Sequence, residues 1–176
     1  MMIGLPGDTF EKSLFTAQQI IQLNADNTRI YPTLVIKDTI LEQLYIEKKY
    51  EPLSIQAALE QTKELVILFE SAHIFIQKIG LHPSEDLCNN NKLVAGPFHV
   101  NFREMVYTEI WNDLFLKEIK NDHHKHIQIE CSPSEINYAI GYKKKNKLRL
   151  QQDFRSVHFH SNDQLKNREF HVFYSE

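Results

Sequence analysis

Met1-Met2-Ile3-Gly4-Leu5-Pro6-Gly7-Asp8-Thr9 is the stretch around which the chain is organised. Its first three residues are typical of the end of a buried strand. Gly4 to Gly7 are typical of a tight turn, and Asp8 or Thr9 is a candidate cap for the helix that follows. Glu11 follows Asp8 at the spacing of a capping box. A strand that passes through glycines into a helix N-terminus predicts backbone N–H groups directed at one spot, where a ligand's polar edge can bind.

The segments that follow alternate between helix and strand patterns. Strand, helix and strand within the first 36 residues predict a right-handed βαβ unit with parallel strands. The alternation as a whole predicts an α/β layer, with helices packed on a parallel sheet. We expect helices over 10–23, 40–47 and 54–72, and strands over 28–36 and 74–79.

A looser region separates this layer from the tail. Residues 82–99 contain two prolines, a glycine and three consecutive asparagines, a composition typical of an irregular loop. A helix over 101–117 and a boundary near 121–125 come next. The tail then shows the order strand, helix, helix, strand, with one more strand after it, over 125–131, 133–140, 145–153, 157–160 and 170–174. We therefore expect two domains, 1–120 and 121–176.

Several stretches together resemble the radical S-adenosylmethionine (SAM) superfamily, in the branch shared by the Elongator catalytic subunit and the oxygen-independent coproporphyrinogen oxidase-like proteins. The resemblance covers about residues 1–117. It is carried by Gly4-Leu5-Pro6-Gly7-Asp8-Thr9, Arg29-Ile30-Tyr31-Pro32-Thr33-Leu34-Val35-Ile36-Lys37, Pro52-Leu53-Ser54, and Gly96-Pro97-Phe98-His99 with Phe102-Arg103-Glu104.

The resemblance implies the C-terminal part of a partial (β/α) barrel in which SAM lies at the carboxyl ends of the strands. It implies that the SAM-binding residues are Gly4, Leu5, Pro6, Gly7, Tyr31 and Pro32. The family binds its [4Fe–4S] cluster through a CxxxCxxC motif, but the only cysteines are Cys88 and Cys131. We expect the cluster-binding strands to lie upstream of Met1, and this chain alone to bind neither group and to perform no radical chemistry.

Other readings of these residues stay open from the sequence alone. The Gly4–Gly7 stretch is also typical of a simple turn. Tyr31 is predicted either in the core or in the wall of a cavity. His99 and Arg103 are four apart and would share one face of a helix start, with a structural role favoured over a catalytic one.

The tail resembles the βααβ core of a K-homology (KH) RNA-binding module, whose GxxG turn contacts a nucleic-acid backbone. Here the second glycine position is Lys144. The nucleic-acid candidates are Gly141, Tyr142, Lys143, Lys144, Lys145 and Arg149, and Lys147 adds to this charge. Because the Elongator subunit acts on transfer RNA, the alternative function is a tRNA-binding module. A solvated basic face is the other interpretation.

Charge and hydropathy argue against a membrane protein, and the histidines do not indicate a metal site. The net charge is −3 and no apolar run is long enough to span a membrane, so we expect a soluble, cytoplasmic protein without a membrane partner. His123, His124 and His126 are interpreted as a surface cluster, and no metal site is predicted. The expected partners are the missing N-terminal radical SAM half, or a second copy paired through the exposed front strand.

Overall fold

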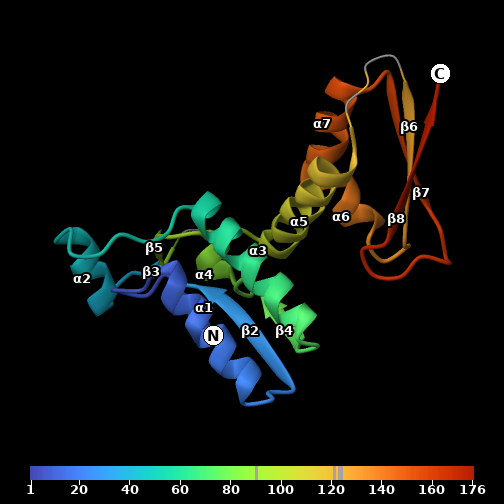
Figure 1. Cartoon of the computed structure of the whole chain (residues 1–176). Helices are drawn as coiled ribbons and strands as arrows, with labels where there is room; N and C mark the ends of the chain where they lie inside the picture. The colour runs from blue at the N-terminus through green and yellow to red at the C-terminus, as the bar shows by residue number, and fades with distance from the viewer. Residues whose placement is uncertain (90, 121, 123–124) are drawn as a thin grey trace. The chain divides into compact units, whose positions relative to one another are not determined.

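Three parallel strands form the centre of the first half of the chain in this computed structural model, which describes residues 1–89, 91–120, 122 and 125–176 (Figure 1). The sheet order is β1 (Met2–Ile3), β2 (Asn27–Pro32), β4 (Phe75–Ile79). Helices α1 (Phe10–Gln22) and α3 (Ile55–Ser71) contact each other and pack on this sheet. A mixed α/β architecture with a parallel sheet is therefore confirmed.

Local side-chain hydrogen bonds determine where the helices begin. The hydroxyl of Thr9 accepts the N–H of Lys12 at 3.3 Å and caps α1, so Thr9 rather than Asp8 is the cap. Ser54 caps α3 in the same way. Thr39 caps α2 (Ile40–Ile46). These caps satisfy N–H groups that the helix itself leaves unpaired, and all three helices begin where the sequence predicts.

The predicted strand over 28–36 is wrong in one respect, because the structure divides it. β2 ends at Pro32, and β3 (Val35–Ile36) pairs antiparallel with β5 (Leu93–Ala95) in a separate two-stranded sheet. Pro32 has no N–H to donate to a neighbouring strand, which favours a strand end there. The region 82–99 is also more regular than predicted, since it contains β5 and the short helix α4 (Glu85–Cys88).

The second half of the chain has a mixed three-stranded sheet of order β7-β6-β8, with β6 parallel to β7 and antiparallel to β8. Its elements are α5 (Phe102–Glu118), β6 (His126–Cys131), α6 (Ile136–Ile140), the 3₁₀ turn η1 (Tyr142–Lys144), α7 (Lys145–Asp153), β7 (Ser156–Ser161) and β8 (Phe170–Ser175). The predicted order of strands and helices is confirmed. However, α6 begins at Ile136, and residues 133–135 form a turn rather than the first helical residues.

The chain divides into the compact units Met1–Arg103 and Glu104–Glu176. Most of α5 therefore belongs to the second unit, whereas the sequence prediction grouped it with the first. The physical reason is that Trp111 and Phe115 of α5 are fully buried in one core with Ile127 and Ile129 of β6. The indole N–H of Trp111 also donates to Glu135 at 2.9 Å, which joins α5 to the turn before α6.

Within the described part of the chain, no helix is both long enough and apolar enough to cross a membrane.

Candidate functional site

The carboxyl ends of β1 and β2 lie next to each other and carry the predicted cofactor residues. Met2 pairs with Tyr31 and Ile3 with Pro32. The carbonyl of Ile3 accepts both the N–H of Thr33, at 3.0 Å, and its hydroxyl, at 2.8 Å. The structure therefore brings the Gly4–Gly7 turn, which follows Ile3, together with the end of β2.

Leu5 to Asp8 form a β-turn of the kind that Pro-Gly favours. The N–H of Asp8 donates to the carbonyl of Leu5 at 2.8 Å, Pro6 is the second residue, and Gly7 is the third with φ +74°. A positive φ at the third position is characteristic of a type II turn and suits glycine. Leu5, Pro6 and Gly7 are all exposed. The backbone of the turn is therefore accessible to solvent, and a ligand could reach it.

The backbone N–H and C=O of Gly4 both have hydrogen-bond partners within the protein. The N–H of Gly4 donates to Asp8 Oδ2 at 2.9 Å, and the hydroxyl of Ser13 donates to the same oxygen at 3.0 Å. The carbonyl of Gly4 accepts the hydroxyl of Tyr50 at 2.6 Å. Among the described hydrogen bonds, none uses the N–H of Leu5 or Gly7. At most two N–H groups of this turn, those of Leu5 and Gly7, are therefore available to a ligand.

Tyr50 holds the candidate turn in place, and sequence reasoning did not single it out. Its side chain is almost fully buried, and burial raises the pKa of its hydroxyl, so it stays a neutral donor to Gly4. Leu53 adds a steric constraint, because a Cβ on Gly4 would lie 2.9 Å from its Cγ. By contrast, a Cβ on Gly7 would meet nothing within 4 Å. Gly4 is therefore fixed by the Tyr50 hydrogen bond and by contact with Leu53, whereas the space around Gly7 is empty.

One face of the parallel sheet carries a shallow, open hollow with both polar and apolar lining residues. A cavity of about 570 Å³ is lined by Met1, Met2, Asn27, Thr28, Arg29, Tyr31 and Gln77. Arg29 Nε donates to Gln77 Oε1 at 3.0 Å across β2 and β4, which holds the guanidinium along this face. Tyr31 is partly exposed and lines the cavity, whereas Pro32 is buried. Tyr31 thus lines this open hollow, and its predicted role in a cofactor cavity stays a prediction.

His99 and Arg103 do not share a helix face. α5 begins at Phe102, so His99 lies before the helix, and only Arg103 is in it. Nδ1 of His99 accepts the N–H of Asn101 at 2.9 Å. The carbonyl of His99 accepts the N–H of Phe102. The contacts of His99 thus shape the entry to α5, where a structural role is the simpler interpretation.

The chain's own thiols do not fit the cluster that the resemblance implies, since the family set needs three cysteines. Cys88 is exposed and Cys131 is fully buried. Burial, with a smaller contribution from Glu135, raises the pKa of Cys131 to about 12, so it is a poor source of thiolate. No group of three metal-binding side chains is placed for an ion among the described residues. His123 and His124, of the predicted surface cluster, lie outside those residues.

A second candidate site is the basic turn between α6 and α7. Gly141 has φ +90°, and a Cβ there would lie 2.9 Å from the Thr108 methyl group of α5. Gly141 is therefore required for packing inside the second unit. Lys143 and Lys144 both have left-handed backbone, with φ +52° and +62°, and both side chains are exposed. Lys144 thus has the backbone conformation that a glycine would adopt easily at this position.

Two buried polar residues hold this turn, and sequence reasoning missed them. Thr108 Oγ1 accepts the N–H of Tyr142 at 2.7 Å and donates to the carbonyl of Glu104. The amide of Asn146 donates to the Thr108 carbonyl at 3.0 Å. Thr108 and Asn146 are polar residues at positions of α5 and α7 that face the core, and both side chains are almost fully buried. A polar residue at a core position is the sequence signal that could have identified them.

The other predicted nucleic-acid residues are engaged to different extents. Lys145 pairs with Glu109, a carboxylate that is itself mostly buried. Arg149 lies 3.7 Å from Asp153 one turn along α7. Lys143 lies over the Tyr142 ring, 5.5 Å from its centroid. The exposed positive charge at this turn therefore comes mainly from Lys143 and Lys144.

Fold and site together define an α/β protein with a ligand-accessible turn at the carboxyl end of a parallel sheet. The family model described as the Radical_SAM C-terminal domain matches residues 25–112, which is half of the chain. The chain therefore belongs to the radical SAM family through this domain, as the resemblance of its motifs predicted.

Two curated relatives match shorter segments. An uncharacterized protein of Methanocaldococcus jannaschii is 34% identical over 53 residues, which is 30% of this chain and 16% of that protein. A tRNA uridine(34) acetyltransferase of Dehalococcoides mccartyi is 39% identical over 54 residues, 29% of this chain and 12% of the relative. The matches thus span well under a fifth of either relative. No solved structure matches the chain.

Proposed function

We propose that this chain forms the later part of the SAM and substrate cavity of an Elongator-like radical SAM enzyme. The observation that carries the proposal is that the Gly4–Gly7 turn leaves the carboxyl end of β1 directly beside the carboxyl end of β2, where Ile3 pairs with Pro32. Ligands in open α/β sheets bind at that edge. The matched C-terminal domain covers β2 and Tyr31, and the turn lies before the matched residues.

The chain's own part in such a site is positioning. When bound, SAM and a [4Fe–4S] cluster supply the radical chemistry, and the protein orients them and excludes water. The N–H groups of Leu5 and Gly7 would contact the polar edge of the adenine, and Tyr31 would form one wall. Because the three thiolates of the family are missing from this sequence, the cluster would have to be held by another polypeptide segment.

Reconstitution with iron and sulfide tests the catalytic half of this proposal. We expect the chain alone to give no 5′-deoxyadenosine from SAM under reducing, anaerobic conditions. Clear formation of that product would show that its own side chains suffice, and the proposal would be wrong.

An NMR titration tests the binding half separately. Without an anchored methionine end we expect weak binding, so millimolar SAM should shift the amide signals of Leu5, Gly7 and Tyr31. The amide of Gly141 also has a positive φ but belongs to the second compact unit, and it serves as the control. Shifts confined to other regions, or none at all, would remove the assignment of this turn.

The second candidate function is tRNA binding through the tail, which the exposed Lys143 and Lys144 favour. Among the described residues, no carboxylate lies within ion-pair distance of either ammonium group. Tyr142 adds a ring on which a base or ribose can stack. That one matched relative is named as a tRNA uridine(34) acetyltransferase supports tRNA as the nucleic acid to test.

Titration with tRNA at several salt concentrations tests this second function. Phosphate contacts make affinity fall with salt, so Lys143→Ala/Lys144→Ala should weaken binding and reduce the log–log slope by about 1.4 to 1.8. Lys48→Ala/Lys49→Ala removes the same charge elsewhere, and Lys48 shares the positive φ, so this variant is the control. Equal loss in both variants would indicate non-specific attraction, and no binding at low salt would exclude the function.

A further inference from the structure

One face of the second sheet carries two histidines and a glutamate in register on three adjacent strands. Glu130 of β6 pairs with His160 of β7 on one side and with His171 of β8 on the other. Side chains at paired positions point to the same face of a sheet. We call these three residues the His-Glu-His row. Strand pairing alone brings them together, which is why the sequence does not indicate a metal site here.

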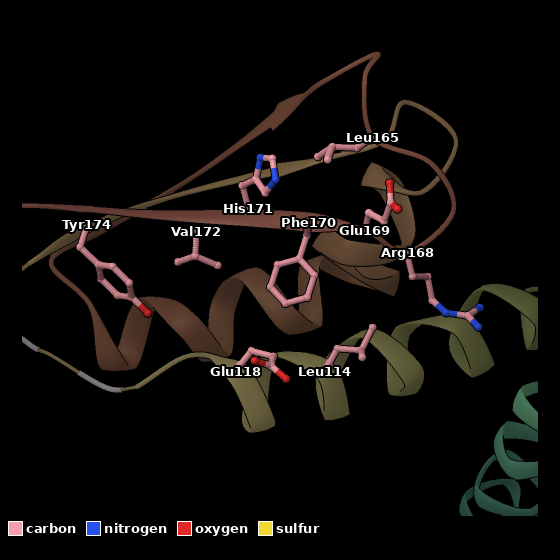
Figure 2. Close-up of a pocket in the computed structure, with 9 residues that line it drawn as sticks. All are labelled: Leu114, Glu118, Leu165, Arg168, Glu169, Phe170, His171, Val172 and Tyr174. Atoms are coloured by element: carbon pink, nitrogen blue, oxygen red, sulfur yellow. The ribbon is translucent and has the colours of Figure 1, made fainter.

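The His-Glu-His row lies on the face of the sheet that is turned away from the core of the second unit. Figure 2 shows His171 on the opposite side of β8 from Phe170 and Val172, which point toward α5. His160 and His171 are exposed, and Glu130 is half-buried between them. Solvent, and an ion dissolved in it, therefore reaches both imidazole rings.

Glu130 is held in place, whereas the two rings are free to turn. Oε2 of Glu130 accepts the amide N–H of Asn162 at 2.8 Å, and the amide nitrogen of Gln128 lies 3.4 Å from Oε1. A carboxylate has lone pairs left for further contacts beyond these two. Within the described part of the chain, no hydrogen bond or ion pair engages the ring of His160 or of His171.

The spacing of the three strands suits one ion above Glu130. Neighbouring strands lie about 4.8 Å apart, so each histidine backbone is about that far from the Glu130 backbone, on opposite sides of it. An imidazole that leans toward Glu130 spans this distance and brings Nε2 over the carboxylate. The rings are not turned this way as they stand, since no group of three is placed for an ion among the described residues. Exposed side chains change rotamer within about a nanosecond, so this rearrangement presents no barrier to binding.

We propose that the His-Glu-His row binds one Zn²⁺ ion and that water completes its four ligands. Imidazole nitrogens with one carboxylate form a donor set that suits Zn²⁺ and the other late first-row ions. Mg²⁺ and Ca²⁺ favour all-oxygen sites. Asn162 orients the carboxylate from outside, as hydrogen-bond partners of metal ligands do. Because β8 pairs with β6 alone in the described chain, the ion ties this edge strand to the rest of the sheet.

Titration with ZnCl₂ followed by calorimetry tests the ligands. We expect one ion per chain, and His160→Ala and His171→Ala should each weaken binding by more than about 100-fold, beyond the usual effect of losing an outer partner. His158→Ala is the matched control. His158 is exposed on the same face of β7, in register with Gln128, but about 6.6 Å further along the strand. An equal loss in His158→Ala, with the fold intact by circular dichroism, would overturn the assignment.

Substitution by Co²⁺ tests the coordination itself, because four-coordinate Co²⁺ absorbs visible light far more strongly than the hydrated ion. Glu130→Gln keeps the size of the side chain but removes its charge, so it should change this spectrum and weaken binding. Asn162→Ala should weaken binding by about 10–100-fold and leave the spectrum the same. Unchanged affinity and spectrum in both variants would show that the carboxylate is not a ligand.

The predicted surface cluster of His123, His124 and His126 is the competing place for an ion. His123→Gln/His124→Gln should leave the Zn²⁺ affinity unchanged. A small amount of paramagnetic Cu²⁺ should broaden the NMR amide signals of the His-Glu-His row before those of other residues. Loss of binding in the double variant would contradict the proposal, as would broadening confined to the start of β6. The absence of any Zn²⁺ binding at micromolar concentrations would also contradict it.

Discussion

Substitution of the two glycines of the first turn by alanine should separate backbone strain from steric crowding. Gly4 and Gly7 have nearly the same φ, +73° and +74°. Their surroundings differ, because a Cβ on Gly4 would lie 2.9 Å from both Cγ and Cδ1 of Leu53 and a Cβ on Gly7 would meet nothing. Gly7→Ala therefore measures the cost of the backbone alone, and Gly4→Ala adds the collision.

The magnitudes follow from these two terms. Left-handed backbone costs a residue with a Cβ about 1–2 kcal/mol, and the stiffer unfolded chain offsets about 0.4–1 kcal/mol of that. Gly7→Ala should thus lower the free energy of unfolding by about 1 kcal/mol. Overpacking typically costs about 1–3 kcal/mol more, so Gly4→Ala should cost about 2–4 kcal/mol.

Urea unfolding followed by circular dichroism measures both values, and hydrogen exchange in α1 assigns the effect to the first unit. Leu53→Ala provides the decisive comparison. If the collision is with Leu53, Gly4→Ala should cost less in the Leu53→Ala background, by about 1–2 kcal/mol. Gly7→Ala should cost the same in either background. Equal costs for the two glycine substitutions, or no coupling to Leu53, would refute this account of the turn.

Four further predictions concern single side chains. Tyr50→Phe leaves the Gly4 carbonyl without its donor and should cost about 1–2 kcal/mol, measured by urea unfolding; an unchanged midpoint would contradict this. Thr108→Val removes both hydrogen bonds of the hydroxyl and should cost about 1–3 kcal/mol, with faster amide exchange in η1 as the check. Cys88 should react with a thiol reagent at once and Cys131 only on unfolding. Because burial raises the pKa of Cys131 from 9.0 to about 12, only the unfolded thiol ionises between those values, so the contribution of Cys131 to stability should be lost as the pH rises above 9 and should be constant below it.

The starts of the first three helices follow from the sequence by itself. Thr9, Thr39 and Ser54 each accept an N–H from three residues ahead, so each cap depends only on its neighbours in the chain. The Pro-Gly turn at Leu5–Asp8 is local in the same sense, because proline and glycine restrict or permit φ wherever they occur. The motifs that indicated the radical SAM family are short stretches as well, and the family match over residues 25–112 covers those from Arg29 onward.

Tertiary structure alone decided which groups of the candidate sites are available. Tyr50 reaches Gly4 across 46 positions of sequence, and Lys145 reaches Glu109 across 36. Neither contact follows from a local pattern, because hydrogen bonds and ion pairs depend on distance in space, which chain folding sets. For the same reason the sequence predicted a basic turn but not that Thr108 holds it, and a strand at β8 but not that, within the described part of the chain, this strand pairs with β6 alone.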